Sequence, residues 1–217
     1  MKVEKKRGSM KDYVYQQILE MICSGKLIPG EIFTEGQMID RFQVSKSPVR
    51  EALIQLCHED VLKSIPRCGY QVVQISARNI SDLTELRLFL ELDSLPRIFE
   101  NLSSEKLEEL HRQNGIRRRN IEDKNVWEAW NNNVLFHLTL NRFAGNAQVT
   151  AALERALSTC TRAYAQIYTT QRAAISPPQP QVITHHDRIV EAMENHDRYL
   201  VHEELRQDII RMEQLLR

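Results

Sequence analysis

Residues 34–56, TEGQMIDRFQVSKSPVREALIQL, constrain the fold of this chain most, because they are typical of two short helices joined by a tight turn. Thr34 and Gln37 have the spacing of a capping box, which predicts the start of the first helix. Ser45 is placed to cap the second helix, with Pro48 in its first turn, where a missing N–H costs nothing. The pattern predicts a helix-turn-helix, whose second helix enters the major groove of DNA.

The flanking segments predict a winged helix around this pair of helices. Residues 10–25 carry apolar side chains at helical spacing. Short strands are expected at residues 61–64 and 69–74, in a hairpin that bends near Gly69. Three helices and a hairpin make up a winged helix-turn-helix, which we expect to form a domain of residues 1–76.

The remainder of the chain, residues 77–217, shows helical patterns and no pattern typical of strands. The helices that we expect there span residues 79–100, 103–122, 126–144, 147–170, 180–195 and 198–216. Helices joined by short connections favour an antiparallel bundle. The predicted fold is therefore mainly α, with a winged helix-turn-helix followed by an all-helical bundle.

The bulk composition is that of an ordinary globular protein, with 217 residues, 42% hydrophobic and 27% charged. The net charge is zero, so any attraction to DNA must be local. The basic N-terminus lacks the apolar core of a signal peptide, and no run of about 18 apolar residues predicts a membrane span. Four scattered cysteines without a C-x-x-C pair favour reduced thiols and a cytoplasmic location.

Polar side chains at the start of the predicted second helix are candidates for contact with DNA. Ser and Lys there can hold phosphates, and Arg50 can bind guanine O6 and N7 bidentately. Arg67, at the tip of the hairpin, can reach a phosphate or the minor groove. The alternative is a solvated helix face with a chance capping box. The candidate DNA-binding residues are Ser45, Lys46, Ser47, Arg50, Arg67 and Gly69.

Several runs resemble known bacterial proteins. The runs VYQQILEMICSGKLIPGEIF, SKSPVREAL and IPRCGYQVV are similar to the winged-helix domain of GntR-type transcription regulators. The helical half resembles the ligand-binding FCD domain of the FadR-like branch. The matching segments there are ELRLFLE (85–91), NVLFHLTLNRFAGN (133–146) and HDRIVEAMENHD (186–197).

This resemblance covers nearly the whole chain and implies a homodimeric regulator that responds to an effector and binds a palindromic operator. It implies contact with DNA through Lys46, Arg50 and the Ser45 hydroxyl. Many relatives carry Arg in the second helix where this chain has Gly36.

Four polar residues occupy apolar positions of the predicted bundle helices. Asn133 and His137 share the apolar face of one helix, His186 centres another, and Asp208 lies among apolar residues of the last. Burying each group alone would cost roughly 2–7 kcal/mol, unless it is paired or bound. The set predicts a divalent-metal site, with zinc, nickel and manganese all suited to it. The alternative is a hydrogen-bonded polar cluster that lines an effector pocket without metal.

The resemblance bears on the same cluster. In many FCD relatives an Asp, a His four residues later and two further His bind a metal such as zinc. Here Asn133 stands in place of the Asp, and Asp208 in place of the last His. The second change keeps a charged ligand, whereas the first replaces a carboxylate with a neutral amide.

Arg87 is predicted to face the bundle interior near Glu91. A buried Arg can grip a carboxylate bidentately, and in the family the matching Arg often helps to bind an organic acid. The alternative is an internal ion pair with Glu91. Tyr164 and Tyr168 are candidates to line the same cavity, although helix-spaced aromatic residues also pack in cores.

The run Arg117-Arg118-Arg119 is interpreted as a solvated face, because acidic residues flank it. We therefore predict a DNA-binding transcription regulator, not an enzyme, controlled by a small carboxylate metabolite. The alternative is a metal-dependent enzyme that uses the helical-domain site. The sequence shows no convincing general base, no Ser-His-Asp set and no phosphate loop to favour that alternative.

Overall fold

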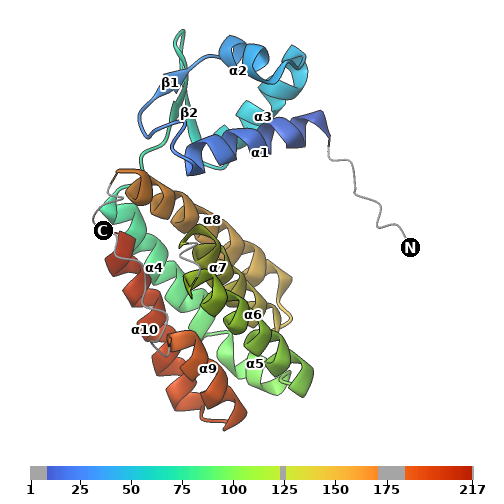
Figure 1. The fold of residues 1–217 in the computed structure, drawn as a ribbon, viewed down its shortest axis with the longest axis vertical. Coiled ribbons are helices and arrows are strands. Elements are labelled where there is room, and N and C mark those ends of the chain that lie inside the picture. Colours follow the sequence, from blue (N-terminus) through green and yellow to red (C-terminus); the bar gives the residue numbers. More distant parts are fainter. Residues whose placement is uncertain (1–8, 123–125, 171–183, 217) are drawn as a thin grey trace. The chain divides into compact units, whose positions relative to one another are not determined.

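The computed structural model describes residues 9–122, 126–170 and 184–216 (Figure 1). The chain divides into two compact units. The first contains the residues up to Ile75 together with residues 165–170, and the second contains the remaining described residues. Helices dominate both units, and the β structure among the described residues is one three-stranded sheet. The predicted mainly α fold is confirmed.

The first unit is a winged helix. Its sheet is antiparallel, with the strand order β1-β3-β2, and β2 and β3 form the predicted hairpin. The two-residue strand β1 was not predicted, because so short a strand carries no periodic signal. The elements are α1 (Met10–Cys23), β1 (Ile32–Phe33), α2 (Glu35–Phe42), α3 (Lys46–His58), β2 (Leu62–Ile65) and β3 (Gly69–Val72).

Local signals start and end the two helices of the helix-turn-helix. The Gln37 N–H donates to Thr34 Oγ1 at 3.2 Å, and the Thr34 N–H donates to Gln37 Oε1 at 2.7 Å, which confirms the capping box. Helix α2 ends at Gln43, whose left-handed backbone turns the chain towards α3. Ser45 occupies the N-cap position of α3 as predicted, but its side chain makes no capping hydrogen bond.

The core of the winged unit is made of apolar side chains from all three helices and the sheet. Strands β1 and β3 approach closely at Gly69, which has a φ of 129°. A Cβ atom at Gly69 would lie 2.3 Å from the Phe33 carbonyl oxygen. Glycine is therefore required where the wing joins the sheet.

The second unit is an all-helical bundle, as predicted. The expected helix over residues 79–100 is divided, because Pro96 lies in the first turn of a separate helix and cannot continue the one before it. The expected helix over 180–195 begins at His185, capped by Thr184, and residues 180–183 lie outside the described residues. The helices are α4 (Ala77–Leu92), α5 (Leu95–Glu100), α6 (Ser104–Glu122), α7 (Val126–Arg142), α8 (Ala147–Thr170), α9 (His185–Glu194) and α10 (Arg198–Leu216).

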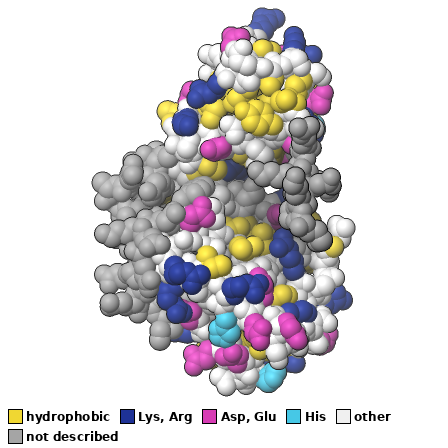
Figure 2. All heavy atoms as spheres, turned by 45° about the vertical axis from the view of Figure 1, so that its right-hand side comes forward, with side chains coloured by type: hydrophobic (Ala, Val, Ile, Leu, Met, Phe, Trp, Pro, Cys, Tyr) yellow, Lys and Arg dark blue, Asp and Glu magenta, His cyan; other side chains and the backbone are white. Residues whose placement is uncertain are grey.

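Three helix pairs build the interior of the bundle: α6 packs on α7, α9 on α10, and α4 on α10. Figure 2 shows Lys and Arg interspersed with Asp and Glu over the surface of this unit, so the face in view carries no patch of a single sign. None of the helices in the described part of the chain combines the length and apolar character that a membrane crossing needs.

Candidate DNA-binding surface and buried polar cluster

The start of α3 presents polar side chains to solvent. Ser45, Lys46, Ser47 and Arg50 are all exposed. Because Ser45 makes no capping bond, its hydroxyl can donate to an outside acceptor. Ser47 instead donates to Glu51 at 2.8 Å. These positions match what contact with phosphates and base edges requires.

One carboxylate lies close to both cations at the start of α3. Glu35, at the start of α2, lies 3.6 Å from Lys46 Nζ and 3.8 Å from Arg50 Nε. Both distances exceed those of a good hydrogen bond, and the Lys46 and Arg50 side chains remain 68% and 63% exposed. Glu35 therefore forms weak ion pairs with the two cations and leaves both side chains exposed to solvent.

The wing supplies the other predicted residues. Arg67 lies in the turn between β2 and β3, is exposed, and has a left-handed backbone with a φ of 66°. Gly69 follows at the start of β3. The side chain of Arg67 is thus presented at the tip of the hairpin, as the sequence predicted.

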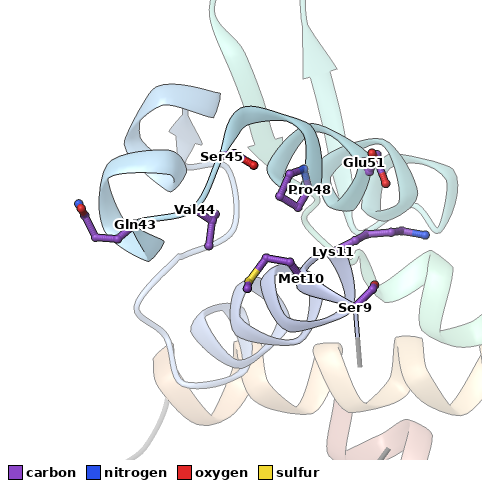
Figure 3. A pocket seen from close by; sticks show the side chains of 8 residues that line it. All are labelled: Ser9, Met10, Lys11, Gln43, Val44, Ser45, Pro48 and Glu51. Carbon is purple, nitrogen blue, oxygen red and sulfur yellow. The ribbon is translucent and has the colours of Figure 1, made fainter. Parts of the chain in front are cut away.

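An open hollow of about 620 Å³ lies between the start of α1 and the start of α3 (Figure 3). Ser45 and Lys11 both line this hollow, so the hollow borders the candidate DNA-binding surface. Its position in the winged unit distinguishes it from the effector pocket expected in the helical unit. The lining residues are Ser9, Met10, Lys11, Gln43, Val44, Ser45, Pro48 and Glu51.

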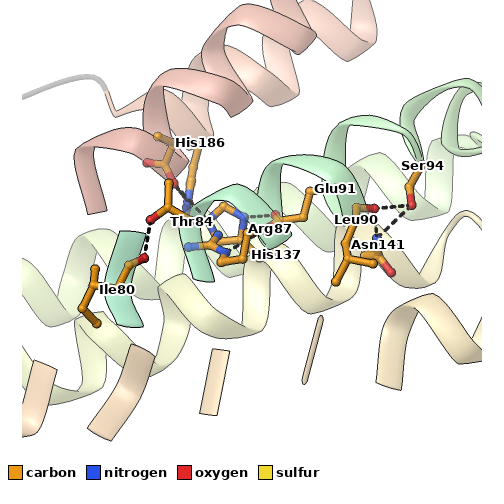
Figure 4. A network of polar contacts seen from close by, with 10 residues as sticks. Ile80, Thr84, Arg87, Leu90, Glu91, Ser94, His137, Asn141 and His186 are labelled. Atoms are coloured by element: carbon orange, nitrogen blue, oxygen red, sulfur yellow. Dashed lines mark hydrogen bonds and ion pairs between the residues drawn. The ribbon is translucent and has the colours of Figure 1, made fainter. Parts of the chain in front are cut away.

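A chain of ionic contacts crosses the interior of the helical unit (Figure 4). Arg87 Nε donates to Glu91 Oε1 at 2.7 Å, and both side chains are buried. Glu91 Oε2 lies 2.6 Å from His137 Nδ1, and His137 Nε2 lies 2.9 Å from Asp208 Oδ2. Helices α4, α7 and α10 each supply part of this chain, so it depends on the assembled bundle.

His186 completes the cluster from α9. Its ring stacks on Phe136 with 3.9 Å between centroids, and its Nε2 lies 3.4 Å from Asp208 Oδ2. Neither ring nitrogen has a hydrogen-bond partner among the described residues, and the same is true of the buried Asn133 Nδ2. Unsatisfied buried nitrogens of this kind indicate a missing ion, water or ligand.

The geometry fits a divalent metal. His137, His186 and Asp208 each offer one ligand atom, and these atoms all lie within 4.8 Å of one another. The Glu91 carboxylate can accept from His137 Nδ1, which leaves Nε2 to face a metal, an arrangement common at metal-bound histidines. Three protein ligands leave coordination positions open for a further group.

The buried charges shift the protonation of the cluster. Burial is the largest influence on His137 and opposes its charged form, but the Glu91 and Asp208 carboxylates together outweigh it, so the pKa of His137 is raised. Burial lowers the pKa of His186 to about 4, only partly offset by Asp208. Burial raises the pKa of Asp208, yet the two imidazoles outweigh it and hold this pKa well below its usual value.

Arg87, predicted as a contact for the effector, forms the ion pair with Glu91 that was the alternative. Tyr164 stacks on Trp130 with 4.1 Å between centroids, which is core packing. The side chain of Tyr168 lies outside the described residues. For both Arg87 and Tyr164 a contact with an effector stays a prediction.

Sequence reasoning missed two members of the site. Glu91 was recognised as a partner for Arg87, but nothing in the sequence linked it to His137. Arg117 was assigned to a solvated face, but its side chain is only partly exposed and its Nε is buried. The helical position of Arg117, three residues after the buried Asn114, was the available signal.

A winged helix joined to a helical bundle with a polar interior is the architecture of a DNA-binding regulator with a ligand-binding domain. Residues 10–72 match the family described as bacterial regulatory proteins, gntR family, and residues 82–211 match the FCD domain. The chain belongs to the GntR family of bacterial regulators, in the branch whose second domain is an FCD domain.

Two curated relatives come from Bacillus subtilis. The uncharacterised HTH-type transcriptional regulator YdhC is 31% identical over 99 residues, which are 46% of this chain and 44% of YdhC. The gluconate operon transcriptional repressor is 30% identical over 121 residues, which are 56% of this chain and 49% of the repressor. The chain therefore spans about half the length of these relatives. Both are named as regulators, so the enzyme alternative gains no support.

The solved structure of Escherichia coli McbR/YncC is similar over almost the whole chain. It aligns with a TM-score of 0.81, covers 96% of this chain and 97% of its own, and is 21% identical. At this level of identity the similarity shows the fold alone.

Proposed function

We propose that this protein is a cytoplasmic, homodimeric transcription regulator whose operator affinity is controlled by a small carboxylate. Residues 1–76 bind double-stranded DNA, and residues 77–217 bind the effector and form the dimer. By analogy with the relatives named as repressors, the bound state at the operator represses transcription.

The observation that carries the DNA-binding role is the exposed pair of cations at the start of α3. Lys46 and Arg50 lie on one side of the recognition helix, gathered by Glu35. Lys46 with the Ser45 and Ser47 hydroxyls would hold phosphates, Arg50 would read guanine, and Arg67 and Gly69 would place the wing against the backbone. Two such domains in a dimer read a palindrome.

A selection from random DNA duplexes tests this role. We expect the purified protein to enrich a two-fold symmetric sequence, with half-sites separated by about one helical turn or a multiple of it. A variant with both Lys46→Ala and Arg50→Ala should enrich no sequence, while its circular dichroism stays that of the wild type. Enrichment of the same palindrome by this variant would contradict the assignment of α3.

We further propose that His137, His186 and Asp208 hold a divalent metal, with the Asn133 amide as a fourth ligand. Zinc, nickel and manganese all accept imidazole and oxygen ligands. When bound, the metal supplies a Lewis-acidic position for a carboxylate oxygen of the effector. The chain itself contributes orientation, because Glu91 fixes the His137 ring and Phe136 stacks on His186.

Elemental analysis of protein purified without chelator or affinity tag tests the metal. We expect about one metal ion per chain, lost in His137→Ala and retained or tightened in Asn133→Asp, which adds a charged ligand. An absence of metal from the wild type, with uptake by Asn133→Asp, would mean that the neutral amide abolishes metal binding. The effector would then be held by the polar side chains directly.

A further inference from the structure

Arg117, on α6, is an unusual arginine in the helical unit. The Nε atom of Arg117 is buried and makes no hydrogen bond. The Arg117 side chain forms no ion pair with any residue that the structure describes. The neighbouring Arg118 and Arg119 are exposed, and Arg118 donates to Asp187 at 2.9 Å. A buried donor without a partner requires an explanation, since nearly all such groups are satisfied in folded proteins.

Contacts between α6 and α9 show which turn of α9 lies beside Arg117. His111 lies 2.7 Å from Glu194, at the end of α9, and Arg118 lies 2.9 Å from Asp187, near its start. The two helices are therefore antiparallel. Arg117 is level with the first turn of α9, where one of the two cluster histidines is found.

Contacts between α6 and α7 show independently which turn of α7 lies beside Arg117. Gln113 Nε2 donates to Thr139 Oγ1 at 2.9 Å, and Asn120 Nδ2 donates to Asn132 Oδ1 at 2.6 Å. Arg117 lies between these two pairs along α6, so it is beside the turn of α7 that ends at His137. Both neighbouring helices thus place Arg117 beside the buried cluster.

The electrostatics agree with this placement. Burial lowers the pKa of Arg117, and the carboxylates of Asp208 and Asp187 partly restore it. Asp208 belongs to the cluster, so the guanidinium is near enough to sense its charge, yet it does not bind it. Arg87 differs, because its guanidinium is already paired with Glu91 at 2.7 Å.

The pairing of buried charges points the same way. The guanidinium groups at the cluster are those of Arg87 and Arg117, and the carboxylates are those of Glu91 and Asp208. Arg87 is paired with Glu91 at 2.7 Å, and Asp208 contacts His137 and His186. Arg117 is therefore the guanidinium of this set without an anion beside it in the described part of the chain, and an interior of low dielectric favours a counter-ion there.

The unpaired groups near Arg117 include amide donors. Asn133 Nδ2 is buried without a hydrogen-bond partner on α7. Asn114, one turn before Arg117 on the same face of α6, has both amide atoms buried and unpaired. Guanidinium and amide N–H groups are the donors that bind carboxylate oxygens.

We propose that Arg117 binds the carboxylate of the effector, in the role that the sequence suggested for Arg87. The proposal rests on the proposed function, in which the helical domain binds a small organic acid. Arg117 supplies the directed, charge-assisted hydrogen bonds, and the buried amide groups of Asn133 and Asn114 supply neutral donors. Arg87 then acts as a positioning residue that holds Glu91, and through it His137.

Ligand titration of the protein as purified, followed by its thermal unfolding midpoint, tests the proposal. The probes are formate, acetate and succinate at constant ionic strength, with sulfate as an anion that lacks a carboxylate. The variants are Arg117→Gln, Arg117→Lys and the matched control Arg118→Gln, whose side chain is exposed. We expect carboxylates to raise the midpoint of the wild type and of Arg118→Gln with the same apparent Kd. In Arg117→Gln this Kd should rise about 10- to 100-fold, and in Arg117→Lys by less.

Equal responses of the wild type and Arg117→Gln would overturn the role of Arg117. A wild type that responds to none of the three carboxylates would also overturn it, and an equal response to sulfate would overturn the carboxylate class. Metal content and operator binding are measured on the same samples. Wild-type protein that lacks metal or binds no operator would count against the proposed function instead, so the two failures are distinguishable.

Discussion

In each unit of this protein one glutamate holds two cationic side chains, and the two arrangements differ in depth and distance. Glu35 in the winged unit is 21% exposed and lies 3.6 and 3.8 Å from its partners, Lys46 and Arg50. Glu91 in the helical unit is 2% exposed and lies 2.7 and 2.6 Å from Arg87 and His137. The partners of Glu35 are at the surface of the winged unit, whereas the partners of Glu91 are buried inside the helical unit.

The difference shows what each charge cluster can do. A solvated ion pair is worth about 0–1 kcal/mol, so Lys46 and Arg50 can exchange Glu35 for DNA phosphate at little cost. A buried pair that loses one partner leaves a charge without solvent, so Arg87 and His137 are fixed in place. Surface cations are available to a large anionic partner, and buried ones can respond only to something that enters the bundle.

The largest expected effect comes from breaking the buried arrangement. Arg87→Met should lower the free energy of unfolding by about 3–5 kcal/mol, because the Glu91 carboxylate is left without its guanidinium. Urea denaturation measures the change. The double variant Arg87→Met, Glu91→Leu should recover most of the loss, since it leaves no unpaired carboxylate and His137 keeps the Asp208 carboxylate at 2.9 Å. A single variant as stable as the wild type would show that Arg87 does not neutralise Glu91.

A smaller effect is expected when the exposed arrangement is altered. Arg50→Ala should weaken specific operator binding by about 1–3 kcal/mol, through the loss of one bidentate base contact. Its free energy of unfolding should change by no more than about 0.5 kcal/mol, as is usual for surface positions. Fluorescence anisotropy with operator and random duplexes measures this, with the exposed Arg41→Ala on α2 as control. Equal losses for the two variants would point to general electrostatics and not to readout by α3.

The pH dependence of the free energy of unfolding tests the buried cluster through His186. The pKa of His186 is about 4 in the folded protein and 6.5 when unperturbed. Between these values the unfolded chain binds a proton that the folded protein does not, so stability present above pH 6.5 is lost as the pH falls. In chelator-treated protein the loss should be about 1.5 kcal/mol between pH 6.5 and 5. The raised pKa of His137 acts in the opposite direction, because its stabilising contribution is fully present only below the unperturbed pKa.

His186→Asn provides the comparison for this measurement, because asparagine does not titrate and all other groups are shared. Urea denaturation at pH 6.5 and pH 5 should show this loss of unfolding free energy in the wild type and not in His186→Asn. Parallel curves for both proteins would mean that His186 takes up a proton in the folded state as readily as in the unfolded chain.

The smallest effect is expected at the glutamate of the surface arrangement. Glu35→Gln should change the free energy of unfolding by less than about 1 kcal/mol, since its two ion pairs are solvated. Removal of a negative charge beside two DNA-facing cations should raise affinity for random DNA a few-fold, which anisotropy at fixed salt can measure. A loss of affinity for the selected operator alone would instead show that Glu35 orients Arg50 for readout.

Much of the winged unit could be predicted from the sequence, because its signals are local. The capping box joins Thr34 and Gln37, which are three residues apart, and Gly69 marks the bend of a hairpin whose two strands are adjacent in the sequence. In the helical unit, His137, His186 and Asp208 were recognised as polar residues on apolar faces, and the structure brings their ligand atoms together. Periodicity predicts which side of a helix faces inward.

Periodicity does not predict the register between helices, and this is where sequence reasoning failed. Glu91 and His137 are 46 residues apart and meet only because α4 and α7 pack with a particular offset. Arg117 carries the same lesson, since Arg118 and Arg119 after it are exposed and only the offsets of α6 against α7 and α9 place it beside the cluster. The helix break at Pro96 was missed for a different reason, because the apolar pattern continues through it.

The ion pair between Arg87 and Glu91 has a consequence for how the bundle assembles. The two residues are four apart on a single helix, so they can meet as soon as α4 forms, without closure of a long loop. Helix α4 can therefore enter the interior with its charge already neutralised, and the desolvation of Glu91 need not wait for a partner from a distant segment. The contact of His137 with Glu91 joins residues 46 apart and depends on the packing of α7 against α4, at a carboxylate that its own helix already positions.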